Sequence, residues 1–267
     1  MNNDTVLVDY YPGGIGMITL NRPDRHNAFD DKMILQLTAA LLDFKKDNKI
    51  KIVILYASGK NFSAGADLDW MKKMIQYSEK ENLADAMQLV ELLKTLSNME
   101  KITIALAKGI TMGGGVGLLA CCDIVIAEEA ARFCFSETKL GLVPATIAPY
   151  VIQAIGPRLA KYYFLTAKIF TAVEARDIKL VHDICSQDVF SNGINLARSL
   201  LKNGPQSLLT IKKLVSRFNS VDDALLNETA LIIAQVRTSA EAQEGLSAFL
   251  EKRDPEWAKS NGGESIK

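Results

Sequence analysis

Hydrophobic and polar positions in the first half of the chain follow two alternating spacings. Short apolar runs predict strands at residues 5–9, 15–20, 50–56, 102–107 and 123–127. Between these runs, apolar side chains recur every three or four positions, which predicts helices at residues 30–46, 68–76 and 80–97. Strands that alternate with helices predict an α/β fold with parallel strand pairing.

The second half of the chain changes to a helical pattern near residue 145. The spacing predicts helices at residues 147–155, 157–165, 171–179, 190–201, 205–218, 221–236 and 240–252. A helical tail has too little core of its own, so we expect it to pack on the α/β body or on another subunit. We predict a body over residues 1–200 and a C-terminal helical region over residues 201–267.

The composition is that of a globular protein with a large core, because 48% of the 267 residues are hydrophobic and 23% are charged. Lysine plus arginine equals aspartate plus glutamate, at 31 each, so no global field attracts nucleic acid. The first residues lack the basic start and apolar stretch of a secretion signal, and no apolar run has the length of a membrane span. We therefore expect a cytoplasmic protein that binds neither nucleic acid nor a membrane.

The cysteines and histidines argue against metal chemistry and against a hydrolytic triad. Cys121, Cys122, Cys134 and Cys185 form no CxxC pair and belong to no histidine cluster. The two histidines lack the neighbouring pattern that marks a triad. We expect no metal site, and cysteines that are small buried side chains in a reducing compartment.

Three adjacent glycines at residues 113–115 follow a β-like run and open an apolar helical stretch. Glycine allows a ligand to approach the backbone closely, and a helix start leaves N–H donors unpaired, so this turn can bind a negative oxygen. No lysine follows at the P-loop position, and Leu118 interrupts the dinucleotide fingerprint, so neither nucleotide motif fits. A tightly packed turn without a ligand is the alternative.

A second turn of small residues lies upstream, at residues 61–68 (NFSAGADL). It also follows a predicted strand and enters a predicted helix. Two such turns at neighbouring strand ends can present two converging backbone N–H groups, which is the arrangement of an oxyanion hole.

Together with residues 21–28 (NRPDRHNA) and 136–144 (SETKLGLVP), the two turns resemble the enoyl-CoA hydratase/isomerase (crotonase) superfamily, in order and spacing, from about residue 5 to residue 257. The resemblance implies an α/β crotonase (ClpP-like) spiral of ββα units with a C-terminal helical trimerisation region. It also implies a homotrimer or a dimer of trimers. The implied substrate is a coenzyme A thioester, with no cofactor beyond the coenzyme A that the substrate carries.

The resemblance further implies roles for individual residues. The backbone N–H groups of Ala66 and Gly114 would bind the thioester oxygen. Glu137 would be the general acid and base, since a carboxylate near an apolar pocket can have a raised pKa; without the resemblance, a glutamate beside Lys139 is more often a surface ion-pair member. The implied substrate-binding residues are Arg25, Ala64, Ala66, Asp67, Leu68, Gly114 and Lys252. Arg25 and Lys252 would meet coenzyme A phosphates, with solvated surface charges as the alternative.

The sequence departs from the family pattern at Gly117. Standard hydratases of the superfamily carry a second glutamate there, which helps to hold the attacking water. Residues 62–71 and 142–150 look like those of methylglutaconyl-CoA hydratase-type enzymes, so we expect hydration of a short or branched 2-enoyl-CoA such as 3-methylglutaconyl-CoA. The alternatives are a Δ3-Δ2 enoyl-CoA isomerase that uses Glu137 alone, a decarboxylase, and an acyl-CoA-binding protein without activity.

Overall fold

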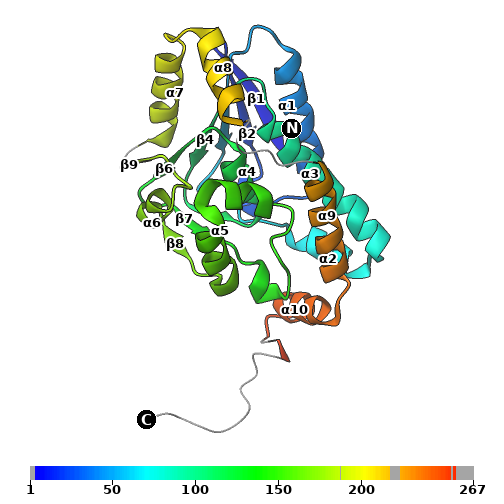
Figure 1. The fold of residues 1–267 in the computed structure, drawn as a ribbon. Helices are drawn as coiled ribbons and strands as arrows, with labels where there is room; N and C mark the ends of the chain where they lie inside the picture. The colour runs from blue at the N-terminus through cyan, green and yellow to red at the C-terminus, as the bar shows by residue number, and fades with distance from the viewer. Residues whose placement is uncertain (1–3, 187, 217–222, 254, 257–267) are drawn as a thin grey trace, which may run out of the picture.

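A six-stranded sheet forms the centre of the molecule (Figure 1). In the computed structural model, which describes residues 4–186, 188–216, 223–253 and 255–256, its strand order is β1-β2-β3-β4-β6-β9. The strands are β1 (Val6–Tyr11), β2 (Ile15–Leu20), β3 (Ile52–Ala57), β4 (Ile102–Ala107), β6 (Ile124–Glu128) and β9 (Asp183–Cys185). β1 and β2 form an antiparallel hairpin and all other neighbours in this sheet are parallel, as the alternation of strands and helices predicts.

A second sheet of three short strands lies beside the first. Its members are β5 (Ile110–Met112), β7 (Arg132–Cys134) and β8 (Phe170–Thr171). Together with β9 they were not predicted from the sequence, because two or three residues are too few to show a period. When these short strands are included, β4 and β5 precede one α-helix, and β6 and β7 precede the next. This is the predicted succession of two strands and a helix.

Ten α-helices surround the sheets in the described parts of the chain. They are α1 (Asp31–Lys46), α2 (Leu68–Gln76), α3 (Glu79–Ser97), α4 (Gly114–Cys121), α5 (Ala148–Thr166), α6 (Ala172–Asp177), α7 (Val189–Leu200), α8 (Pro205–Ser216), α9 (Asp223–Arg237) and α10 (Ala240–Leu250). The two helices predicted on either side of Gly156 form one kinked helix, α5, in which Gly156 has φ +78°. Within the same described ranges, every helix is too short or too polar to cross a membrane.

Side-chain caps determine where several of these helices begin. The carboxylate of Asp30 accepts a hydrogen bond from the N–H of Met33 at the start of α1. Ser78 and Glu81 form a reciprocal capping box at the start of α3. Such caps satisfy N–H groups that have no acceptor inside the helix, so the helix starts follow from local sequence.

The inner strands β2, β3 and β4 are buried on both faces of the sheet, which explains why they are apolar without interruption. On one face, Ile54 and Leu106 belong to a cluster that packs under α7. On the other face, Val53, Leu55 and Ala105 belong to the larger cluster that includes α1, α3 and α4. The sheet is thus a rigid platform for the loops that leave its strand ends.

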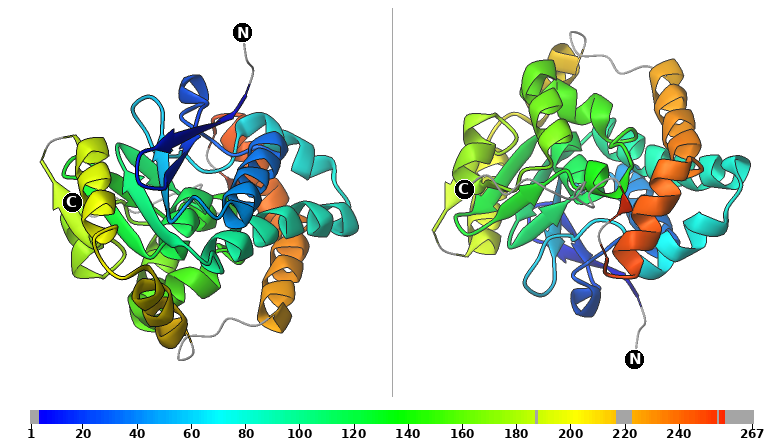
Figure 2. Two further views of the ribbon diagram at one scale, coloured as in Figure 1. Left: turned by 90° about the horizontal axis from the view of Figure 1, so that it is seen from above. Right: turned by 90° about the horizontal axis from the view of Figure 1, so that it is seen from below.

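The last two described helices close one side of the molecule. α9 packs along α3, and α10 packs against α2 and the 3-10 helix η2 (Glu137–Leu140), as the orange and cyan ribbons of Figure 2 show. Residues 217–222, where the predicted helices 205–218 and 221–236 approach each other, lie outside the described residues, as does residue 257, where the family resemblance ends. The C-terminal helices therefore reach α2, which follows the turn at residues 61–68, and η2, which begins with Glu137.

Candidate active site

The two small-residue turns are joined by a short stretch of parallel pairing. Ser63 and Thr111 form a parallel bridge, in which Ser63 N–H donates to the carbonyl of Ile110 at 3.2 Å and Met112 N–H donates to the carbonyl of Ser63 at 2.9 Å. Ala66 stands three residues after Ser63, and Gly114 stands three residues after Thr111. The pairing therefore brings the two predicted donors to the same end of adjacent segments.

The backbone pairing gives no acceptor to the N–H groups of the two predicted donors, Ala66 and Gly114. Phe29 N–H donates to the carbonyl of Gly65 and Asp67 N–H donates to the carbonyl of Phe29, so this bridge leaves the N–H of Ala66 unused. Gly114 is the first residue of α4, where an N–H has no intrahelical acceptor. Because the helix dipole also favours negative charge at that end, the two N–H groups are suited to bind an oxyanion.

Glycine is required where the second turn passes closest to its neighbours. Gly113 has φ +48° and ψ −118°, a conformation that side chains disfavour, and a Cβ there would lie 3.1 Å from Oε1 of Glu137. A Cβ on Gly115 would lie 2.9 Å from Cβ of Ser63. The glycines thus allow the backbone of this turn to lie directly against the Glu137 carboxylate and the first turn.

The segment at residues 21–28 is hydrogen-bonded to the turn at residues 61–68 and stabilises it. The buried amide of Asn27 donates to the carbonyls of Ser58 and Asn61, both at 2.8 Å. The guanidinium of Arg22 lies 2.9 Å from the carboxylate of Asp67, whose other oxygen accepts from the N–H of Asp69 at the start of α2. The role of Arg22 was not predicted, and it fixes the carboxylate that caps the helix beside the oxyanion turn.

Glu137 is half-buried, and one oxygen of its carboxylate lies in the interior without a partner. It opens η2, and its Oε2 has no hydrogen-bond partner. No cation of the described chain forms an ion pair with it, so the surface pair with Lys139 that its sequence position suggests is absent there. Burial raises the pKa of Glu137 to about 7. A carboxyl group with such a pKa can both accept and return a proton near neutral pH.

The raised pKa of Glu137 makes the stability of the fold depend on pH. The folded state holds this proton more tightly than the unfolded chain, so the contribution is present below about pH 4.5 and is lost as pH rises to about 7. We expect Glu137→Gln, which cannot ionise, to be more stable than the wild type by about 3 kcal/mol at pH 8, with the difference vanishing near pH 4.5. Chemical denaturation at both pH values measures the difference, and equal gains at the two would contradict the assignment.

A cavity of about 670 Å³ contains these groups. Its wall is mainly apolar and combines the two turns with residues from η2, α9 and α10. Representative apolar lining residues are Phe29, Met71, Leu89, Ile147, Ile233, Leu246 and Phe249. This is the environment that raises the pKa of a carboxylate and strengthens hydrogen bonds to a developing negative charge.

The structure brings nearly all of the predicted site residues to this cavity. Among the predicted site residues, those that line the cavity are Arg25, Ala64, Ala66, Asp67, Leu68, Gly114 and Glu137. Arg25 is exposed and lies 3.3 Å from the carboxylate of Asp69. Lys252 does not line the cavity; it is exposed just beyond α10, and its neighbour Arg253 lines the cavity instead. A substrate contact from Lys252 stays a prediction.

The space beside Gly117 is filled by Ile147. A Cβ on Gly117 would lie 2.3 Å from Cγ2 and 2.9 Å from Cβ of Ile147, and 3.6 Å from Leu93. Gly117 does not line the cavity, whereas Ile147 does. The space at the position where the family resemblance implies a second glutamate is therefore filled by a hydrocarbon side chain, and residue 117 supplies no carboxylate.

We expect residues 117 and 147 to be coupled in stability. Gly117→Ala should lower the free energy of unfolding by about 1–3 kcal/mol, because its methyl group overlaps Ile147. Ile147→Ala removes the nearer of the two contacting carbons, so adding Gly117→Ala to it should cost less than the same change in the wild type. Urea unfolding of the two single variants and the double variant measures the coupling, and additive losses would contradict the packing described.

A group of three buried side chains that was not predicted includes two that line the cavity, Trp70 and Arg237, and one that contacts both of them, Asp85. The guanidinium of Arg237, at the end of α9, lies 3.0 Å from the carboxylate of Asp85 on α3. The other Asp85 oxygen accepts a hydrogen bond from Nε1 of Trp70 at 2.9 Å. Trp70 is 5% exposed and also lines the cavity, so it packs in the core and forms part of the cavity wall. Asp85 and Arg237 lie 152 positions apart, so no local pattern could connect them.

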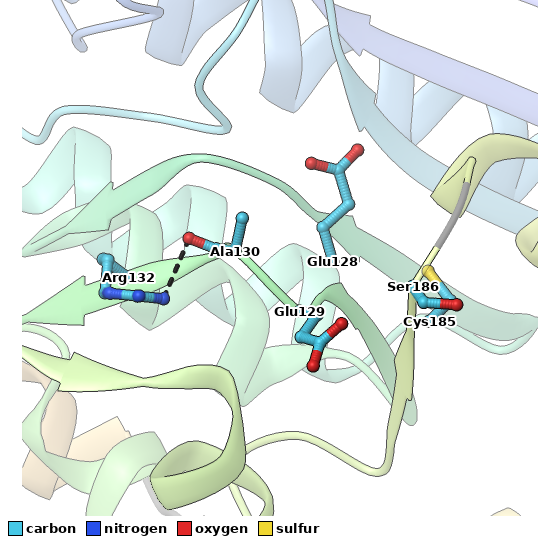
Figure 3. Close-up of a pocket in the computed structure, with 6 residues that line it drawn as sticks. All are labelled: Glu128, Glu129, Ala130, Arg132, Cys185 and Ser186. Carbon is cyan, nitrogen blue, oxygen red and sulfur yellow. Dashed lines mark hydrogen bonds between the residues drawn. The ribbon is translucent and has the colours of Figure 1, made fainter.

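A second hollow, of about 540 Å³, lies at the end of β6 (Figure 3). Its lining side chains include Glu128 and Glu129, which point in different directions, and Arg132, which donates to the carbonyl of Ala130. Cys185 is half-buried there, and burial raises the pKa of its thiol. These groups do not converge on one point, so we assign the chemistry to the first cavity.

The described residues include no group of three or more side chains that could hold a metal ion. His182 is occupied by the N–H of Val125, which donates to its Nδ1 at 3.0 Å. Cys121 and Cys122 are buried, and burial raises the pKa of both thiols, so neither is a reactive thiolate.

Comparisons with known proteins agree with this geometry. Residues 11–260 match the model of the family described as enoyl-CoA hydratase/isomerase. The chain is 30% identical to 2,3-dehydroadipyl-CoA hydratase of Escherichia coli, covering 90% of this chain and 94% of that protein. It is 30% identical to mitochondrial methylglutaconyl-CoA hydratase of Mus musculus, covering 91% and 74%. A crystal structure of an enoyl-CoA hydratase from Shewanella pealeana is 44% identical, with a TM-score of 0.78 over 95% and 96% of the two chains, and it confirms the predicted fold.

Proposed function

Because the chain belongs to the enoyl-CoA hydratase/isomerase family, we propose that it adds water across the 2,3 double bond of a short or branched enoyl-CoA, with 3-methylglutaconyl-CoA as its substrate. The observation that carries this proposal is the buried, unpaired carboxylate oxygen of Glu137 in the cavity that two unused backbone donors also line. The names of the relatives from Escherichia coli and Mus musculus both denote thioesters of dicarboxylic acids, which supports a substrate of that kind.

The proposed reaction needs one carboxylate and two N–H donors. Ionised Glu137 takes a proton from water while the water oxygen bonds to C3, and the electrons of the double bond move onto the thioester oxygen. The N–H groups of Ala66 and Gly114 stabilise that charge. Glu137 then returns the proton to C2, so the net change is the addition of one water. One group serves as base and acid because Ile147 fills the place of a second carboxylate.

The surroundings of the site complete the proposal. We propose that Arg25, and Lys252 from a neighbouring subunit, bind the phosphates of coenzyme A, and that no further cofactor takes part. We also propose a homotrimer or a dimer of trimers assembled through residues 201–267. Sedimentation velocity of the purified chain measures the assembly, and a monomer would contradict this part of the proposal.

The second candidate is a Δ3-Δ2 enoyl-CoA isomerase, and the observation that favours it is the packing of Ile147 against Gly117. A lone carboxylate can take a proton from C2 and return it to C4 without the participation of water. An apolar wall at that point therefore suits isomerisation. The oxyanion donors would serve the same enolate in both reactions.

Three substrates separate the candidates. The chain is incubated with 3-methylglutaconyl-CoA, crotonyl-CoA and a 3-enoyl-CoA, and products are identified by mass spectrometry. Hydration of the first or second supports the hydratase. Isomerisation of the 3-enoyl-CoA with no hydration would replace it with the isomerase, and release of carbon dioxide from the dicarboxylic substrate would show a decarboxylase. Absence of any reaction would leave an acyl-CoA-binding protein.

A further inference from the structure

One cation lies buried in the apolar wall of the cavity. Arg237 is 8% exposed and lines the cavity where α9 ends, near Trp70, Leu89 and Ile233. The other described cations that line the cavity are Arg25, Lys139 and Arg253, and all three are exposed. Arg237 is therefore a positive charge on the inner wall, whereas the others lie in contact with solvent.

The guanidinium of Arg237 is only partly satisfied by the protein. Its Nη1 donates to the Asp85 carboxylate at 3.0 Å, while its Nε is buried and has no acceptor. A guanidinium has five N–H donors in a planar fork, and leaving one of them unpaired in the interior is unfavourable. The Nε edge is therefore a part of the guanidinium for which the described protein supplies no acceptor.

Arg237 is also held in a defined orientation. Asp85 receives hydrogen bonds from Arg237 and from Nε1 of Trp70, so side chains from α2, α3 and α9 meet at one point. A buried ion pair contributes little net stability compared with apolar residues of similar volume. An oriented cation in the wall of an acyl pocket is better explained by a ligand that carries a carboxylate.

The charge balance of the Arg237–Asp85 pair permits a ligand that carries a carboxylate. Burial raises the pKa of Asp85, although Arg237 and Trp70 both donate to it and oppose that rise. A second carboxylate beside Arg237 would favour protonation of Asp85 further, because like charges at short range disfavour ionisation. Arg237 then pairs with the carboxylate of the ligand while Asp85 is neutral, so the apolar wall gains no net negative charge.

We propose that Arg237 binds the distal carboxylate of a dicarboxylyl-CoA substrate and thereby selects dicarboxylic over monocarboxylic acyl groups. This inference rests on the proposed function, since it assigns the far end of the acyl group whose thioester lies at Ala66 and Gly114. Charge-assisted hydrogen bonds between guanidinium and carboxylate are short, directional and often bidentate, which gives the discrimination its physical basis.

Binding of unreactive analogues tests the inference apart from catalysis. Glutaryl-CoA and pentanoyl-CoA have the same number of acyl carbons and differ at the distal end, where one has a carboxylate and the other a methyl group. Isothermal titration calorimetry with the full chain should give glutaryl-CoA the lower Kd, by about 10- to 100-fold. Equal Kd values for the two ligands would overturn the inference without the use of any variant.

A matched pair of variants then assigns the preference to Arg237. Asp85→Asn/Arg237→Met removes the cation without leaving an unpaired buried carboxylate, and it should bind both ligands with similar Kd values. Asp85→Asn alone retains the cation and should keep the preference for glutaryl-CoA. Unchanged affinity for pentanoyl-CoA shows that the pocket is intact, and a preference that survives the loss of Arg237 would overturn the inference.

Failure of the inference and failure of the proposed function give different results. Selective binding of glutaryl-CoA by a chain that hydrates no enoyl-CoA would overturn the hydratase and leave the role of Arg237 in place. Hydration of 3-methylglutaconyl-CoA and of its monocarboxylic counterpart, 3-methylpent-2-enoyl-CoA, with equal kcat/KM would support the hydratase and overturn the role of Arg237.

Discussion

Glu137→Gln lowers kcat by about 10²- to 10⁴-fold, with little change in the affinity for an unreactive acyl-CoA. The substitution keeps the shape of the side chain but removes the group that accepts and returns the proton. Because Ile147 occupies the space next to Gly117, no carboxylate at that position can take over. The loss is therefore expected to fall on the chemical step and not on binding.

Steady-state kinetics with crotonyl-CoA or 3-methylglutaconyl-CoA, together with calorimetric binding of butyryl-CoA, measure the two effects separately. Glu129→Gln is the matched control, since Glu129 is exposed and lies outside the catalytic cavity, and it should react at the wild-type rate. In the wild type, kcat/KM should rise with pH and level off above about 7, because the base must be ionised before it reacts. A Glu137→Gln variant with near wild-type kcat would remove Glu137 from the mechanism.

Gly114→Pro has the second largest expected effect, a decrease in kcat of about 10²- to 10³-fold. Proline has no N–H, so the change deletes one of the two proposed oxyanion donors. Gly114 is the first residue of α4, and proline is well tolerated at the first position of a helix. The fold should therefore survive a change that removes the donor.

Gly114→Ala is the control for this substitution. It adds a Cβ, which would lie 3.0 Å from the ring of Phe29, but it retains the N–H. We expect Gly114→Ala to keep most of the activity, while circular dichroism confirms that the proline variant is folded. If the alanine variant loses as much activity as the proline variant, packing against Phe29 and not the N–H explains the loss.

Local sequence was sufficient to predict the parts of the site that depend on backbone geometry. The glycines at 113–115 and the turn at 61–68 could be recognised because each follows a strand and enters a helix, and parallel pairing then brings their ends together. Asp67 caps α2 from its position directly before an apolar helical pattern, which is a feature of local sequence. The raised pKa of Glu137 follows from the same reasoning once the pocket is apolar.

Contacts between distant segments could not be predicted in the same way. Ile147 fills the place beside Gly117 because the loop before α5 folds over α4, and nothing in the spacing of either residue indicates this. Arg237 and Asp85 meet only because α9 packs along α3. The short strands β5, β7, β8 and β9 depend on pairing partners for their existence, so their two or three residues carry no periodic signal.

The cavity combines residues that are made at different times during synthesis of the chain. Ala66, Gly114 and Glu137 all belong to the first part of the sequence, whereas the wall formed by Ile233, Arg237 and other residues of α9 and α10 comes near its end. Chains are made from the N-terminus, and α10 packs on η2, which begins with Glu137. A nascent chain therefore has the proposed donors and the Glu137 carboxylate before it has the apolar wall contributed by α9 and α10. The site becomes complete only when the last helices have left the ribosome and docked.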